Sequence, residues 1–310
     1  GAVQLPKGSA HLHMDLQIIA SVFVVVVVGG MGSILGAYLA ALLISLIRVL
    51  LITNAQVTLG GVAAWQMELV SMFLVMALVL ILRPWGLLGR REVLGYQHSS
   101  TPEPMLRPAD RSLQLAGLGV LVLLIVLPWI AGPYLVSVAT EVLIFVLFAA
   151  SLQFLMGLGG VISFGHAAYF GLGAYGVGLA VRHWGAPMEL ALLAAPLLAA
   201  GGALLFGWFC VRLSGVYLAM LTLAFAQIAW SIAFQWIELT GGDNGIIGIW
   251  PPAWAGSITA YYYFAGAICV LGVLLLRRFA FAPFGYTLRA GRDSALRADA
   301  IGIDVRRHRW

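Results

Sequence analysis

Lysine is almost absent from this sequence, and this scarcity excludes a P-loop nucleotide-binding site. Lys7 is the only lysine among 310 residues, and it follows Pro6. A phosphate-binding P-loop needs a glycine-rich turn that ends in lysine and then serine or threonine, so the sequence contains no such nucleotide site. Charge is scarce in general, because charged residues make up 9% of the sequence and hydrophobic residues 62%. That balance predicts a membrane protein with several spans.

Cysteine is scarce as well. Cys210 and Cys269 fall inside apolar segments, too far apart in sequence to form a metal-ligand pair of the CxxC kind, and they imply no disulfide framework. Histidine, aspartate and glutamate are not paired at ligand spacing, which argues against a membrane enzyme, so we predict no metal and no cofactor in this chain. The formal net charge of +5 comes from arginines in short stretches between apolar segments. This is typical of cytoplasmic loops beside membrane lipid and not of a nucleic-acid surface.

The order of the apolar segments predicts an all-α fold, a polytopic transmembrane helical bundle. Residues 1–88 hold about three membrane segments, and residues 89–112, rich in arginine and proline, change the composition sharply and predict a cytoplasmic linker. Residues 113–310 form a second module with six apolar segments: 113–130, 134–156, 166–181, 190–211, 216–237 and 258–276. Arginines in the tail place it on the cytoplasmic side like the linker, and six crossings agree with that.

One stretch, residues 157–178, does not look like an ordinary span. It is apolar but carries eight glycines, Ser163 and His166. A bilayer offers no water to open backbone, so a glycine-broken segment at that depth must pack against other helices or line a wet cavity. Two interpretations stay open, glycines as packing points or a segment beside a transport path. For a path we predict a role for Ser163, Gly165, His166, Gly171, Gly173, Glu141 and Gln153, because polar groups at membrane depth face protein or water.

Two further stretches outside the spans have distinct patterns. The segment 238–257 is expected on the outer side, and its turn-forming part carries Glu238, Gly241, Gly242, Asp243 and Asn244. Glycine, aspartate and asparagine favour a structural turn there, while one carboxylate among glycines is too few ligands for calcium. Residues 283–304 show near-helical apolar spacing with arginines between, which predicts a short amphipathic helix on the cytoplasmic side, ended by Gly302. Such a helix lies on lipid or docks into a partner's groove.

Three stretches in this order resemble the permease subunits of branched-chain amino acid ABC importers of the LivM type, over residues 113–305: GLGGVISFGHAAYFGLGAY, then LSGVYLAMLTLAFAQIAWSIAFQWIELTGGDNGIIGI, then FGYTLRAGRDSALRADAIGI. Residues 14–90 look like the C-terminal part of the LivH-type partner. The chain is therefore expected to be a fragment of a LivH–LivM fusion, with both ends internal to a longer protein.

The resemblance implies the partners and the roles of several residues. ATP and magnesium would be bound by separate ABC ATPase subunits, which the amphipathic helix would engage through Arg289, Arg292, Leu296, Ala298 and Gly302. A periplasmic or extracellular solute-binding protein would deliver substrate at the outer loop, and a second or complementary permease module would complete the path. The expected location is the bacterial cytoplasmic (inner) membrane.

Other functions stay open at this point. Related permeases carry urea and amides, so the same resemblance allows those solutes. A secondary transporter or channel that works without ATP would need buried carboxylates and inverted repeats, and the sequence shows one deep carboxylate, Glu141, and no clear inverted repeat. For a zwitterionic amino acid, Glu141 is the candidate partner of the ammonium group, and N–H groups at the start of a glycine-broken helix are candidates for the carboxylate.

Overall fold

The computed structural model describes residues 14–53, 58–59, 62–63, 67–89, 108 and 110–310. The predicted all-α fold is confirmed: most of this part of the chain is helical, and two strands of two residues each, β1 (Thr58–Leu59) and β2 (Val62–Ala63), pair as a short antiparallel hairpin. Within it, six helices are long and apolar enough to cross a membrane. The chain forms two compact units, which we describe separately. Most of the predicted linker lies outside the described residues.

The first unit comprises residues 1–93, 164–168 and 205–245. Its helices are α1 (Met14–Gly29), α2 (Ile34–Thr53), α3 (Met67–Leu82) and α8 (Gly215–Gln235), followed by a short α9 (Ile237–Thr240) and a 3-10 turn, η1 (Gly242–Asn244). The helices pack α1 on α2 and α3 on α8. Val24, Val28, Met76, Leu80 and Leu221 are buried between them. Because helix α8 has a long run of buried residues, it is the core helix of this unit.

The elbow between α1 and α2 is built from glycine. Gly30 and Gly32 have φ of +99° and +82°, which glycine adopts without steric cost. The two helices come together at Gly29 and Gly36, where a Cβ on either residue would overlap the other segment's backbone. Gly32 is not part of this contact, since apart from its chain neighbours no described atom lies within 4 Å of its Cβ position. Gly32 serves the turn instead.

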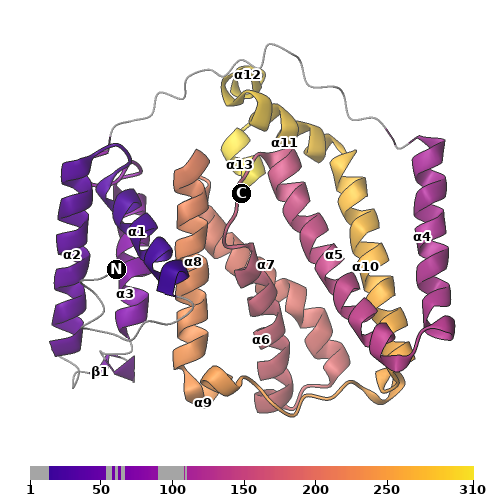
Figure 1. Ribbon diagram of the computed structural model, residues 1–310. Coiled ribbons are helices and arrows are strands. Elements are labelled where there is room, and N and C mark those ends of the chain that lie inside the picture. Colours follow the sequence, from indigo (N-terminus) through magenta and orange to yellow (C-terminus); the bar gives the residue numbers. More distant parts are fainter. Residues whose placement is uncertain (1–13, 54–57, 60–61, 64–66, 90–107, 109) are drawn as a thin grey trace. The chain divides into compact units, whose positions relative to one another are not determined.

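The second unit comprises residues 94–163, 169–204 and 246–310. Its longest contact is between α5 (Pro133–Gly159) and α10 (Ile258–Ala280), which lie side by side in Figure 1. Val136, Leu143, Tyr262 and Cys269 are buried where they meet. The unit also holds α4 (Arg111–Ile130) and most of α6 (His166–Trp184) and α7 (Met188–Cys210). Large apolar side chains stay exposed along α4, which suits a lipid-facing helix.

Helix α4 is held by hydrogen bonds to its backbone. Pro128 has no N–H, so the carbonyl of Leu124, four residues earlier, lacks its usual helical donor. The hydroxyl of Tyr262 on α10 donates to that carbonyl over 2.7 Å, and the hydroxyl of Tyr263 donates to the carbonyl of Ile125 over 2.9 Å. The two tyrosine hydroxyls therefore hold α4 against α10 at the place where the proline interrupts the helical hydrogen bonds.

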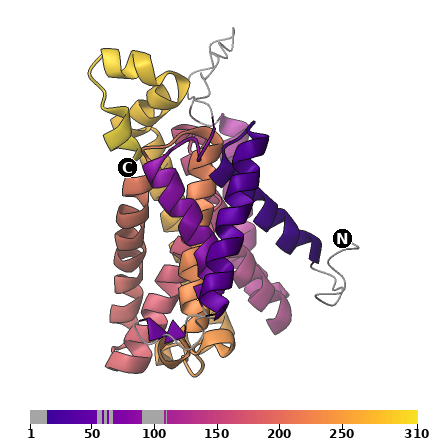
Figure 2. The ribbon, with the colours of Figure 1, turned by 90° about the vertical axis from the view of Figure 1, so that its left-hand side faces the viewer.

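The two ends of α10 carry different structures. At one end, three short helices follow: α11 (Pro283–Asp293), α12 (Ala295–Ala300) and α13 (Val305–Arg309), which we call the arm and which is yellow in Figure 2. At the other end, a loop with the 3-10 turn η2 (Ala253–Ala255) leads into α10, and the Ser257 hydroxyl accepts the N–H of Ala260 as its N-cap. The arm and the loop place the candidate sites at opposite ends of this unit.

Candidate functional site

The glycine-broken segment is a real break between two helices. Helix α5 ends at Gly160, whose φ of +62° and ψ of +20° are left-handed, as in the common glycine C-cap. Its N–H donates to the carbonyls of Leu155 and Met156. The chain is not helical again until His166 begins α6, and Ser163 is buried within this stretch. The segment therefore has open backbone, as the sequence predicted.

In the first unit, the last two residues before α6, Phe164 and Gly165, contact α8. The N–H of Phe164 donates to the Thr222 hydroxyl over 3.1 Å, and that hydroxyl donates to the carbonyl of Ala219 over 2.6 Å. Gly165 is buried, and a Cβ there would overlap the Thr222 carbonyl. Glycine is needed here because backbone lies directly against backbone. Sequence reasoning missed Thr222, although a hydroxyl within an apolar run is the kind of signal that marks such a contact.

Farther along α6, the glycines fall into two groups. In the second unit a Cβ at Gly176 would overlap Leu198 of α7, and one at Gly178 would lie 2.9 Å from Ile246. At Gly173 the nearest atom is the Ala195 carbonyl at 3.8 Å, and at Gly171 no described atom lies within 4 Å. Gly176 and Gly178 are thus packing points. Gly171 and Gly173 have room beside them, and a path role for both stays a prediction.

The two polar groups predicted on α5 lie far apart. Glu141 and Gln153 are both exposed, and at 1.5 Å per residue they are separated by about 18 Å along the helix. The Gln153 amide lies near Gly157, with Nε2 3.1 Å from the position of a Cβ there. Glu141 lines a separate cavity toward the other end of α5.

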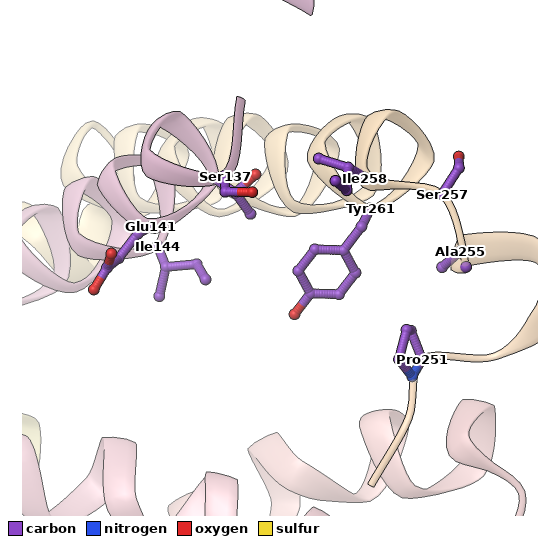
Figure 3. Close-up of a pocket in the computed structure, with 10 residues that line it drawn as sticks. Ser137, Glu141, Ile144, Pro251, Ala255, Ser257, Ile258 and Tyr261 are labelled. Atoms are coloured by element: carbon purple, nitrogen blue, oxygen red, sulfur yellow. The ribbon is translucent and has the colours of Figure 1, made fainter. Parts of the chain in front are cut away.

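That cavity lies between the N-terminal halves of α5 and α10 and the loop before α10. Its volume is about 360 Å³. Figure 3 shows Glu141 and Ile144 of α5 and Tyr261 of α10 projecting to the same side, with Pro251 of the loop opposite. The remaining lining residues are Ser137, Thr140, Ala255, Gly256, Ser257 and Ile258. One carboxylate, several hydroxyls and an apolar wall suit a small cation with an aliphatic substituent.

The segment 238–245 of the first unit, predicted to lie on the outer side, forms a compact turn. Gly241, Gly242 and Gly245 have φ of +79°, +60° and +65°, as glycine permits. The Thr240 hydroxyl lies 2.8 Å from the carbonyl of Trp236, and it accepts the N–H of Gly242. Glu238, Asp243 and Asn244 are exposed on this turn. Their contact with a binding protein stays a prediction.

The arm corrects one expectation in detail. A single amphipathic helix over 283–304 was predicted, but Ser294 breaks it, because its backbone is extended and its hydroxyl caps α12 by accepting the N–H of Arg297. The break changes the helical register. Ala298 is therefore buried, Leu296 is 65% exposed, and Gly302 ends the stretch with φ of +87°. An exposed leucine at this place is available to a partner.

Two arginines of α11 do not point freely outward. Arg289 has 14% of its side chain exposed and lies 3.8 Å from Asp293. Arg292 donates to Asp293 through Nε and Nη2, at 3.0 and 2.9 Å, and its Nη1 donates to the carbonyl of Gly157. Arg309 of α13 donates to the carbonyl of Gly291 over 2.9 Å. Burial lowers the pKa of Arg309, while Asp299 opposes that shift.

With this geometry described, comparison with known proteins identifies the family. The family described as branched-chain amino acid transport system / permease component matches residues 134–310, more than half of the chain. The chain belongs to this permease family. The resemblance to permeases of branched-chain amino acid transport systems is thereby confirmed, and with its six apolar helices the chain is a multi-pass membrane protein.

The permease has two curated relatives at moderate identity. It is 28% identical over 243 residues to the high-affinity branched-chain amino acid transport system permease protein LivM of Escherichia coli (strain K12), covering 69% of this chain and 57% of the relative. It is 26% identical over 243 residues to the protein of the same name from Salmonella typhimurium, covering 68% of this chain and 57% of the relative. The chain thus spans less than two thirds of each relative's length. No solved structure matches it.

Proposed function

We propose that this chain is the membrane-spanning permease subunit of an ATP-driven importer of branched-chain or other hydrophobic amino acids in a bacterial inner membrane. The observation that carries the proposal is the family match over 134–310, which covers the broken segment, the cavity and the arm together. In this proposal the chain hydrolyses no ATP, and separate ATPase subunits bind ATP and magnesium. A solute-binding protein delivers substrate at the turn around Asp243. Residues 14–90 belong to a LivH-type module.

The cavity at Glu141 is the proposed contact for the substrate's ammonium group. It offers one carboxylate, hydroxyls that donate or accept, and apolar surface from Ile144 and Ile258. Opposite charge favours an ammonium over a neutral solute such as urea, and the apolar wall favours an aliphatic side chain. The N–H groups that open α6 at His166 are a separate candidate contact for the carboxylate, since helix N-termini attract anions.

The experiment is uptake of radiolabelled leucine into proteoliposomes that hold the complete importer and its binding protein. We expect uptake to require ATP, and Glu141→Gln to raise the KM for leucine roughly tenfold, which corresponds to about 1.4 kcal/mol of lost binding. Glu189→Gln is the matched control, because it also removes one carboxylate, and its amide oxygen can still accept the 2.9 Å hydrogen bond from Trp254. Uptake without ATP would support a secondary transporter instead. Competition by urea and not by leucine would overturn the proposed substrate.

A further inference from the structure

Arg292 joins the arm to the broken end of α5. Its Nη1 donates to the carbonyl of Gly157, 135 residues earlier in the sequence. Its other nitrogens hold Asp293, so the guanidinium bridges a backbone carbonyl and a carboxylate. The planar fork of arginine makes such a bridge possible, whereas a lysine ammonium lacks that geometry. The side chain is partly buried, with 24% of its surface exposed.

The end of α5 is shaped to receive this side chain. The last carbonyls of a helix lack helical partners and carry partial negative charge, so a cation is favourable there. Gly157 provides one such carbonyl. Gly160 provides space, because a Cβ there would lie 3.1 Å from Cδ and 3.2 Å from Cβ of Arg292, and closer still to Cγ. The end of α5 is therefore complementary to the Arg292 side chain in both charge and shape.

Contacts between α11 and α13 hold the arm together. Arg309 donates to the Gly291 carbonyl, and Asp304 accepts the N–H of Arg307 at the start of α13 over 2.9 Å. Gly291 is buried against Val305, where a Cβ would lie 2.8 Å from that side chain. A displacement of α12 or α13 is therefore passed to α11, on which Arg292 lies.

We infer that Arg292 is a positioning residue that couples the arm to the glycine-broken segment at the end of α5, residues 157–163. The inference rests on the proposed function, in which ATPase subunits engage the arm. Movement of the arm shifts the guanidinium and with it the carbonyl of Gly157, and the open backbone that follows changes position. Arg292 thereby acts inside the permease and does not itself dock the ATPase. This differs from the sequence-based expectation, which placed it among the ATPase contacts.

The test uses the complete importer in proteoliposomes with Arg292→Gln, Arg292→Lys and Gly160→Ala. The control is Arg306→Gln, which removes the same charge from an exposed site on α13. Three quantities are measured: the ATPase subunits that co-purify, ATP hydrolysed, and leucine taken up per ATP. For all three variants we expect normal co-purification and uptake per ATP lower by roughly 5- to 150-fold, the usual range of coupling between sites. A merely structural role would lower hydrolysis and uptake together and leave their ratio unchanged.

Each alternative outcome is decisive. Unchanged uptake per ATP in the folded variants would overturn the inference. Loss of ATPase co-purification with Arg292→Gln, but not with Arg306→Gln, would also overturn it and return Arg292 to the docking surface. If Arg292→Gln yields too little protein, Arg292→Lys, which keeps the charge, is measured in its place. Leucine uptake per ATP in that variant then tests the inference. If no ATPase subunit co-purifies with the unaltered permease, the proposed function itself fails, and the inference fails with it.

Discussion

Replacing Gly165 by alanine tests how closely the broken segment lies against α8. The φ of Gly165 is not among the positive glycine values, so the backbone conformation itself accepts alanine. The added Cβ would overlap the Thr222 carbonyl and lie 2.7 Å from its carbon. Backbone cannot rotate away as a side chain can. We expect Gly165→Ala to destabilise the protein by about 1–3 kcal/mol, the usual cost of overpacking.

The matched control is Gly171→Ala, six residues later in the same segment. No described atom lies within 4 Å of its Cβ position, and the residue is inside helix α6. Alanine is better than glycine in a helix by about 0.8–1.0 kcal/mol, so this variant should be more stable than the unaltered protein. The two substitutions add the same methyl group and should differ by about 2–4 kcal/mol.

The assay is the thermal unfolding midpoint of both variants in the same detergent, with the double variant Gly165→Ala, Thr222→Ala as a third sample. The double variant should be less stable still, because the overlap is with backbone and the change also removes the hydroxyl that Phe164 uses. Equal midpoints for Gly165→Ala and the unaltered protein would refute the close approach. Recovery in the double variant would show that the overlap is with the Thr222 side chain.

Two further predictions concern α10 and the arm. Tyr262→Phe leaves the Leu124 carbonyl without its donor and should lower the free energy of unfolding by about 1–3 kcal/mol, more than Tyr263→Phe, whose side chain is exposed; chemical denaturation of both variants measures the difference. Leu296→Asp should abolish co-purification of ATPase subunits without shifting the unfolding midpoint, because Leu296 is 65% exposed. A shifted midpoint, or ATPase binding that survives, would contradict that surface.

The sequence was sufficient for the features that repeat along the chain. Apolar runs predicted the helices, and the glycines of residues 157–178 predicted the break, because both signals are local. Contacts between distant segments were not predictable in this way. The bond from Arg292 to Gly157, the Thr222 hydroxyl under Phe164, and the tyrosine that replaces the donor missing at Pro128 each join segments far apart in sequence.

Register was the other limit. The spacing of apolar residues over 283–304 fits one helix, yet one serine cap at Ser294 shifts the register and moves Leu296 to the surface. A serine caps a helix only if its hydroxyl accepts the N–H three residues later. The free energy of this capped arrangement differs by only about 1 kcal/mol from that of a helix that continues through the serine. The predicted domain boundaries and the roles assigned to Glu141, His166 and the outer turn remain predictions.

The way α4 is held has a consequence for how its sequence can vary. Its described residues include none that is fully buried, and the tyrosine hydroxyls contact its carbonyls, which every amino acid possesses. Most exchanges among apolar residues along α4 should therefore be tolerated, as lipid accepts them equally. Pro128 and Tyr262 should not be exchanged singly, because the Tyr262 hydroxyl supplies the hydrogen bond that Pro128 cannot donate. In a library of random variants, this helix should be permissive at most positions and strict at a few.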